Sequence, residues 1–471
     1  MTMEQRFARG LVLGALALLG GCMVGPRYDT PEQPPIALAS AQAAGFTAPD
    51  AVLPARWWTL FDDPVLEQWI DAALARNHDI RQAQASWYAA RAVFDERRLD
   101  RTPGITASAG YERGIQQQMD ADGEPARMLS ESWRAGFDMQ WEIDLFGRLE
   151  RLQQAALARA DAAQAELTLM RLSIAAEVAR TYFEAQGLQR QIAVTEQEIA
   201  NWDETVRLTD AMVRAGSGLP EDLENAKSQK LRSVAALAPL DTALQQAHFR
   251  LDVLAGERPG QGLGVPGERT AGIWVRQLPL GDVDTLIRRR PDVVRAERQL
   301  AASVEDVGAA TAELYPRLDL GGFIGFFALR DGDLGSASRA FQLAPGLSWP
   351  ALRLGNARAR LRGAEALSEG AQARYEQAVL QAQEEVENAV TRLSDNQRRM
   401  AALLQSARHA EAAFDIADKR YRAGAGAYLA VLENQRALFL ARQAIAEAET
   451  ASFVDVVAVY KALGWGAGDV L

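Results

Sequence analysis

The chain has 471 residues, of which 48% are hydrophobic and only 7% aromatic, and its formal net charge at pH 7 is −11. This negative charge disfavours binding to nucleic acid. The length alone suggests two or three globular domains, whereas the abundance of alanine, leucine, glutamine, glutamate and arginine favours long helices that pack through small side chains.

Residues 1–21 have the three parts of a bacterial export signal: basic Arg6 and Arg9, an apolar stretch over residues 11–19, and small residues before a cleavage site. The only cysteine, Cys22, follows a leucine and two glycines in the order of a lipobox. A plain secretory signal with an incidental cysteine is the alternative, but an unpaired cysteine in an oxidising compartment would have no other use. We therefore expect a covalent lipid on Cys22 and no other cofactor.

The residues after Cys22 predict where the lipidated chain resides. Met23 stands where an aspartate would retain a lipoprotein at the inner membrane, so we expect delivery to the outer membrane. No later apolar run approaches the roughly 18 to 20 residues that a membrane-spanning helix needs. We interpret residues 22–64 as a lipidated, extended segment and expect no spanning helix in the mature chain.

The rest of the chain contains a tandem duplication. At an offset of 213 residues Asp79 matches Asp292 and Pro103 matches Pro316; at an offset of 208 residues Trp141 matches Trp349, Gly147 matches Gly355, and Arg214-Ala215-Gly216 matches Arg422-Ala423-Gly424. The change of offset gives the first copy five extra residues before Trp141, as expected of a variable loop. The predicted division is a first repeat at 65–258, a linker at 259–280, a second repeat at 281–464 and a tail at 465–471.

Each repeat is predicted to contain a helix, two strands and a long helical hairpin. Sixty-eight residues without proline separate Gly147 from Gly216, and the same number separate Gly355 from Gly424. One helix of that length extends about 100 Å, far beyond the usual globular helix. A soluble coiled coil is the alternative interpretation of these two segments alone.

Glycine-rich turns close both hairpins, because glycine suits a helix end and a tight reversal. Pro239 predicts a kink in the first returning helix, and Trp274 with Val275 predicts a short strand in the linker. The residues expected at the hairpin tips are Arg214, Gly216 and Gly218 in the first repeat, and Arg422, Gly424 and Gly426 in the second.

After Pro103 and Pro316 the apolar residues alternate with polar ones instead of following a helical period. The predicted strands lie near residues 105–111, 133–145, 318–326 and 341–349, although Pro345 weakens the last of them. Strands with one apolar and one polar face are typical of a transmembrane β-barrel. Four strands cannot close a barrel, so the chain must oligomerise, and a dimer, trimer or tetramer would give 8, 12 or 16 strands.

The chain resembles the TolC-like outer membrane factor family, and within it the NodT-type lipoproteins. The resemblance spans essentially the whole mature chain. The residues that carry it are Cys22-Met23-Val24-Gly25-Pro26, Trp57-Trp58, Phe61-Asp62-Asp63-Pro64, Asn77-His78-Asp79, Glu142-Ile143-Asp144-Leu145-Phe146-Gly147, Arg289-Arg290-Pro291-Asp292 and Arg420-Tyr421-Arg422-Ala423-Gly424.

This resemblance implies a mainly α protein with a transmembrane β part. It implies a homotrimeric channel-tunnel, with four strands per chain in a shared 12-stranded barrel, a long α-helical barrel in the periplasm and an equatorial belt. The implied function is a passive, non-enzymatic exit duct in the outer membrane. Its implied partners are a periplasmic adaptor and an inner-membrane pump, with the RND type expected, although the sequence alone favours neither a proton-driven nor an ATP-driven pump.

The resemblance also implies a periplasmic gate at the hairpin tips. By position, Tyr421 on one tip would face Asp222 on the other, and Glu433 would point into the narrowest ring. The family commonly places acids at two levels, but this chain has Ala430 at the first of them. A single ring of Glu433 carboxylates would favour cations.

Other interpretations were weighed against this one. The basic run 288–290 fits an ion-paired helix face better than an anion site, and the three histidines lack metal-ligand spacing. No phosphate loop or nucleophile elbow indicates an enzyme. The remaining rival is a lipid-anchored periplasmic coiled-coil scaffold without a pore, which predicts segments after Pro103 and Pro316 that are not amphipathic.

Overall fold

The computed structural model describes residues 23–31, 35–36, 46–47, 56–119, 123–264, 278–279, 282–329 and 335–466. The chain divides into two compact units: Met1–Glu32, Ser86–Gln164 and Arg295–Glu376 in the first, and Gln33–Ala85, Ala165–Val294 and Gln377–Leu471 in the second. The predicted signal at residues 1–21 and the predicted lipidation site, Cys22, lie outside the described residues.

Both repeats contain the same series of elements. In the first these are α2 (Pro64–Arg76), α3 (His78–Leu99), β2 (Gly104–Met119), β3 (Pro125–Ile143), α4 (Arg148–Arg214) and α5 (Pro220–Leu254). In the second they are α6 (Val283–Arg289), α7 (Pro291–Ala312), β5 (Arg317–Ala328), β6 (Arg339–Ser348), α8 (Leu354–Arg422) and α9 (Tyr428–Ala462). Helices α3, α4, α7 and α8 contribute residues to both units.

The remaining described elements are short. They are the strands β1 (Phe46–Thr47) and β4 (Leu278–Pro279) and the 3-10 helices η1 (Trp57–Phe61), η3 (Ser336–Ser338) and η4 (Ala351–Arg353). No helix in the described part of the chain is both long enough and apolar enough to cross a membrane.

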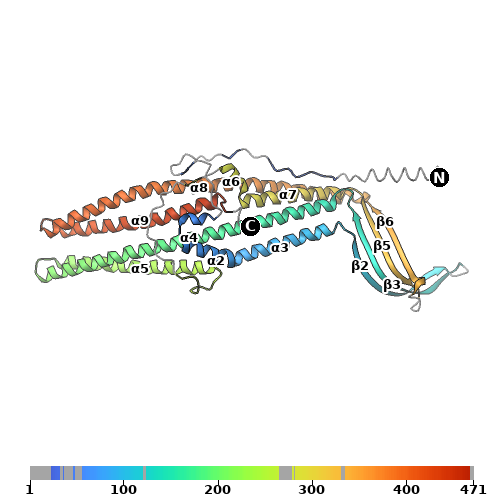
Figure 1. Ribbon diagram of the computed structural model, residues 1–471, viewed down its shortest axis with the longest axis horizontal. Helices are drawn as coiled ribbons and strands as arrows, with labels where there is room; N and C mark the ends of the chain where they lie inside the picture. Colours follow the sequence, from blue (N-terminus) through green and yellow to red (C-terminus); the bar gives the residue numbers. More distant parts are fainter. Residues whose placement is uncertain are drawn as a thin grey trace. The chain divides into compact units, whose positions relative to one another are not determined.

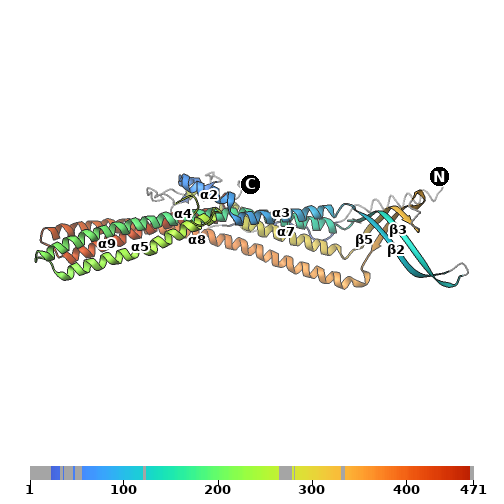
Figure 2. The same ribbon diagram turned by 90° about the horizontal axis from the view of Figure 1, so that it is seen from below.

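The four strands of the first unit form one curved antiparallel sheet in the order β2-β3-β5-β6 (Figures 1 and 2). Its register aligns Ala107, Phe137, Ile324 and Phe341 in a row across the sheet. The apolar side chains of this row are open to the surroundings, with Phe341 85% exposed and Ile324 64%. The predicted alternation is therefore confirmed: one face of the sheet is apolar and the other largely polar. Among the described strands, β2 and β6 are the edges, each paired on one side only.

The first β-hairpin is longer than the second. Strands β2 and β3 have 16 and 19 residues, whereas β5 and β6 have 12 and 10. The expectation that the extra residues of the first copy form a variable loop is wrong, because they lengthen the strands. Pro345 lies within β6 opposite Leu320. It is tolerated there because an edge strand has backbone groups without a partner in the sheet.

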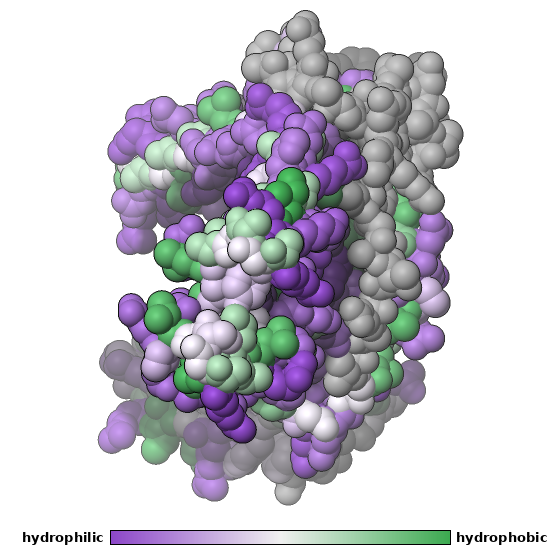
Figure 3. Space-filling model, turned by 90° about the vertical axis from the view of Figure 1, so that its left-hand side faces the viewer, coloured by the Kyte–Doolittle hydropathy of each residue, from purple (hydrophilic) through white to green (hydrophobic). Residues whose placement is uncertain are grey.

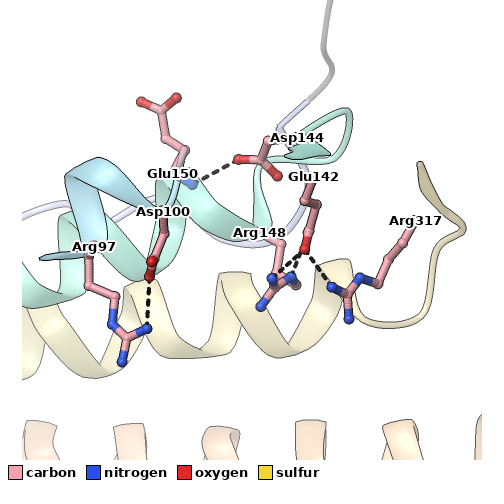
Figure 4. Close-up of polar contacts among 7 residues, drawn as sticks. All are labelled: Arg97, Asp100, Glu142, Asp144, Arg148, Glu150 and Arg317. Carbon is pink, nitrogen blue, oxygen red and sulfur yellow. Dashed lines mark hydrogen bonds and ion pairs between the residues drawn. The ribbon is translucent and has the colours of Figure 1, made fainter. Parts of the chain in front are cut away.

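A polar cluster joins the sheet to the long helix α4 (Figure 4). Glu142 at the end of β3 accepts hydrogen bonds from Arg148 Nη2 at 2.6 Å and from Arg317 Nη2 at 2.5 Å. Asp144 accepts a hydrogen bond from the backbone N–H of Glu150 at 2.8 Å, which satisfies one of the free N–H groups at the start of α4. The end of β3 is thus fixed to both α4 and the start of β5.

The described segment nearest to the N-terminus is fixed within the first unit. Arg151, only 1% exposed, pairs with Glu305 at 2.7 Å and donates from Nη2 to the carbonyl oxygen of Val24 at 3.4 Å. The Tyr28 hydroxyl donates to Glu297, and its ring packs on a small cluster of alanines. Side-chain contacts from α4 and α7 therefore determine where this segment runs.

The second unit contains two long helical hairpins, α4–α5 and α8–α9 (Figure 1). Aromatic residues from distant parts of the sequence pack together at the other end of these hairpins from their turns. Phe183 of α4 stacks on Phe453 of α9 and meets Phe61 of η1, each pair with ring centroids 4.8 Å apart. Trp57 stacks on Tyr460 at 5.5 Å. Burial of these rings supplies a large hydrophobic contribution that holds the hairpins to η1.

One contact recurs in both repeats at equivalent positions. Asn77 and Arg290 each separate the two short helices of their repeat, where the sequence predicted a single helix. Asn77 Nδ2 donates to the carbonyl oxygen of Leu254 at 2.9 Å, and Arg290 Nη1 donates to that of Ala462 at 2.5 Å. The two carbonyls belong to the last residues of α5 and α9, so each repeat caps its returning helix with a buried polar side chain.

Two smaller predictions concern the linker and the first returning helix. Strand β4 pairs in parallel with β1, whereas Trp274 and Val275, where a strand was predicted, lie outside the described residues. Helix α5 continues through Pro239, and the kink there stays a prediction. In the basic run, Arg288 pairs with Asp284 at 2.9 Å, as an ion-paired helix face requires.

Candidate functional site

Both hairpins turn through the same backbone arrangement. Gly216 and Gly424, each two residues beyond the end of its long helix, both have a φ of 72°. This left-handed conformation costs little only for glycine, which explains why glycine follows each long helix. Ser217 N–H donates to the carbonyl oxygen of Met212 at 3.0 Å, and Ala425 N–H does the same to Arg420 at 2.9 Å.

The second glycine of each turn lies where there is little space for a side chain. A Cβ atom at Gly218 would lie 3.0 Å from the Cβ of Met212, and one at Gly426 would lie 3.2 Å from the Cβ of Arg420. The structure therefore places all four predicted tip glycines in the turns. It also places Arg214 and Arg422 there, in the last turns of α4 and α8.

These two arginines project from the hairpin ends. Their side chains are 78% and 75% exposed. Arg214 pairs with Asp210 and Arg422 pairs with Asp418 at 2.9 Å, each four residues earlier on its helix. Such exposed pairs contribute little to stability, so their charge is available to a partner. Seen end-on, the face with the turns is mostly hydrophilic, with hydrophobic residues between (Figure 3).

A cluster of tyrosines joins the two hairpins near these ends. The rings of Tyr421 and Tyr428 lie 5.1 Å apart. The Tyr421 hydroxyl meets Met212 Sδ at 2.9 Å, and Thr209 Oγ1 donates to the Tyr428 hydroxyl at 3.1 Å. Both contacts connect the end of α4 with the second hairpin.

The predicted gate residues occupy this region but are not all in contact within one chain. Burial, and then the negative charge of Asp222, raise the pKa of Tyr421 above its ordinary value, so the two residues are near each other. The hydrogen bond recorded for the Tyr421 hydroxyl is nevertheless the one to Met212. Glu433 is exposed on α9, one helical turn beyond Ala430. Their roles in a gate stay predictions.

A groove of about 600 Å³ lies between α4, α8 and α9 and ends at the tyrosine cluster. Glu198 lines it and is only 5% exposed. Burial raises the pKa of Glu198 to about 7, while a hydrogen bond with Trp202 and the positive charge of Arg442 counteract part of that rise. A carboxyl group near the groove is therefore half protonated close to neutral pH.

Sequence reasoning missed Thr209, Met212, Tyr428 and Glu198. Each occupies a helical position in a segment with no motif. Only the rotation of one long helix against another brings Thr209 to Tyr428, which are separated by 219 residues. The repeat makes residues 209–216 equivalent to residues 417–424, but equivalence in sequence does not predict which residues of the two hairpins are in contact.

These elements define a class of protein: a duplicated chain in which each repeat contributes two strands to a two-faced, open sheet and forms one long helical hairpin. The match to a family model agrees with this. The model for outer membrane efflux proteins matches residues 69–257 and 283–465, once for each repeat. The chain belongs to the outer membrane efflux protein family, and it functions as an outer-membrane efflux channel.

Individual relatives match over nearly the whole chain. The outer membrane protein OprJ of Pseudomonas aeruginosa is 31% identical over 98% of this chain and 96% of its own length. Nodulation protein T of Rhizobium leguminosarum bv. trifolii is 27% identical over 94% of both chains. The solved structure of the outer-membrane channel OprN is 37% identical, with a TM-score of 0.90 over 95% of this chain and all of that one. The resemblance inferred from the motifs is confirmed.

Proposed function

We propose that three copies of this chain form the exit duct of a tripartite efflux system. In this proposal the sheets of the three copies close one 12-stranded barrel in the outer membrane, and the hairpins extend into the periplasm as a tunnel. A periplasmic adaptor joins the hairpin ends to an inner-membrane pump of the RND type. The duct itself is passive and carries out no catalysis.

The observation that carries this proposal is the open, two-faced sheet. Its edges β2 and β6 leave backbone N–H and C=O groups without partners in the sheet. Such unpaired groups are strongly destabilising in lipid, because no water is there to bond them. Closure by other copies satisfies the edges and turns the polar face inward. The exposed side chains of Phe341, Leu343 and Leu347 then face lipid, which the scaffold alternative leaves unexplained.

The proposed lipid on Cys22 would be attached to the residue before Met23. Met23 lies so close to Gly147, at the start of α4, that a Cβ atom there would meet its Cγ at 2.6 Å. Met23 is therefore fixed at the junction between β3 and α4. A lipid on the preceding residue, Cys22, would add a membrane anchor to this end of the chain.

Cross-linking from the hairpin turns tests the complex. Because Cys22 is the only cysteine and is proposed to carry lipid, Ser217→Cys or Ala425→Cys would each provide a single free thiol at an exposed position. We expect a thiol-reactive cross-linker in living cells to capture a periplasmic adaptor, identified by mass spectrometry. Ala351→Cys, exposed in η4 near the sheet, is the matched control and should capture none. Equal capture from all three positions, or none from accessible turns, would refute the proposed docking.

The proposed gate predicts an ion preference. Three symmetry-related Glu433 carboxylates would attract cations in a narrow bore. We expect Glu433→Ala to reduce the cation preference of the channel, measured as the reversal potential across a planar bilayer with a salt gradient. Glu447→Ala, a carboxylate on the same helix α9, provides the control. An unchanged reversal potential in Glu433→Ala would remove this residue from the gate.

A further inference from the structure

Phe323 is an aromatic residue on the largely polar face of the sheet. The register sets it beside Asp138 of β3 and Gln342 of β6, in a row that begins with Thr106. A phenyl ring on such a face should be well exposed, yet Phe323 is only 8% exposed. Local side chains and backbone must therefore cover it.

The ring of Phe323 packs against two glycines. A Cβ atom at Gly136 would come within 2.8 Å of Phe323 Cε2, and one at Gly325 within 3.0 Å of its Cζ. Gly136 and Gly325 are register partners on neighbouring strands. The ring therefore lies flat over the space that two side chains would otherwise occupy.

Arg134 covers the opposite side of the ring. Its guanidinium carbon lies 4.0 Å from the ring centroid, a close cation–π distance. Asp138 pairs with the guanidinium, and the Ser108 hydroxyl donates to the same carboxylate. The Arg134 side chain is nevertheless 43% exposed. One planar face of the guanidinium thus rests on Phe323, while the group as a whole stays accessible.

We propose that Arg134, held on Phe323, is a contact site of the channel wall for planar aromatic anions. A guanidinium stacks on aromatic rings with either face and donates to carboxylates through its edge, which an ammonium group does not match. The site opens into a hollow of about 510 Å³ that Thr106, Gln140 and Gln342 also line. The inference rests on the proposed function, because it takes the polar face of the sheet as the channel interior.

Closure by three copies would repeat the site three times around the same level of the barrel. The pairing with Asp138 keeps each site close to neutral, so small inorganic ions gain little from it. An aromatic carboxylate gains both a stacking contact and a charge-assisted hydrogen bond. The site therefore discriminates by shape and charge together.

Partial block of single channels by 1-naphthoate tests the site. Cyclohexanecarboxylate carries the same charge without an aromatic ring and serves as the comparison probe. For the wild-type channel in planar bilayers we expect 1-naphthoate to act at the lower concentration. Arg134→Lys, which keeps the charge, and Phe323→Leu, which removes the ring, should each raise its half-blocking concentration about three- to tenfold.

Arg113→Gln is the control for loss of a positive charge from the sheet, because Arg113 is 59% exposed, pairs with Glu131 and lies by its register on the opposite face from Arg134. It should leave the block unchanged. Equal half-blocking concentrations in wild type and Arg134→Lys, or a conducting wild-type channel that 1-naphthoate does not block, would overturn the site. Equilibrium dialysis of 1-naphthoate against the purified protein in detergent separates the two proposals. A channel that does not conduct argues against the proposed function, whereas loss of binding only in the Arg134 and Phe323 variants still supports the site.

Discussion

Replacing Arg290 with alanine is expected to destabilise the protein by about 3 to 5 kcal/mol, the usual cost of removing one partner from a buried, hydrogen-bonded ion pair. Arg290 is 5% exposed. It bonds Asp292 at 2.7 Å, Glu385 at 2.6 Å and the carbonyl oxygen of Ala462 at 2.5 Å. Burial alone would raise the pKa of Asp292, but the hydrogen bond and charge of Arg290 hold it below its ordinary value. The variant therefore leaves an unpaired, partly buried carboxylate and an uncapped α9.

The preceding residue supplies the control for this variant. Arg289 carries the same charge but is exposed at the end of α6, so Arg289→Ala should change stability by less than about 0.5 kcal/mol. Thermal unfolding of both purified variants in detergent measures the difference. Similar losses from Arg289→Ala and Arg290→Ala would mean that the buried network is not what stabilises this region.

The wild type is expected to become less stable as the pH rises, because Glu198 ionises. Glu198→Gln is expected to abolish this part of the pH dependence. The pKa of Glu198 is about 7 in the folded chain, against an ordinary value of 4.5. Folding therefore favours the protonated carboxyl, and ionisation between these two values opposes folding. The wild type should lose about 2 to 3 kcal/mol from this group between pH 5 and pH 8. The glutamine variant cannot ionise and should not lose this contribution.

Unfolding experiments at pH 5 and pH 8 measure this difference between variant and wild type. Glu204→Gln is the control, because Glu204 lines the same groove but is 56% exposed and paired with Arg207. Asp455, whose burial raises its pKa to about 6, titrates in the same direction but is present in every variant, so its effect cancels. If Glu198→Gln and wild type show the same pH dependence, Glu198 is not buried as described.

Local sequence signals were sufficient to predict the main elements. The absence of proline between Gly147 and Gly216 predicted a helix that the structure gives as Arg148–Arg214. The two-residue alternation from Ile105 onward predicted the strands and their faces. Both signals depend on the chain's own periodicity, which needs no knowledge of distant residues. The duplication then doubled the evidence, since each copy tested the assignment of the other.

The contacts between elements could not be predicted in the same way. The pairing of Arg151 with Glu305 depends on how α4 and α7 are rotated about their axes, and several rotations bury comparable numbers of alanines. The stacking of Arg134 on Phe323 depends on two glycines that look like turn or barrel-bend residues in the sequence. The predicted pairing of Tyr421 with Asp222 stays a prediction. Position identified the two tips, but the hydroxyl meets the sulfur of Met212.

The unpaired edges of the sheet have a consequence for how the channel is made. In the proposed trimer, β2 and β6 of a single chain would leave backbone groups unsatisfied in lipid, so insertion would require the other copies. Under the proposed assembly, membrane integration would depend steeply on the local concentration of chains, because it would require encounters between them. A chain that met no other copy would not insert its strands and would stay exposed to proteases. The yield of channels would thus rise more steeply than in proportion to the rate of synthesis.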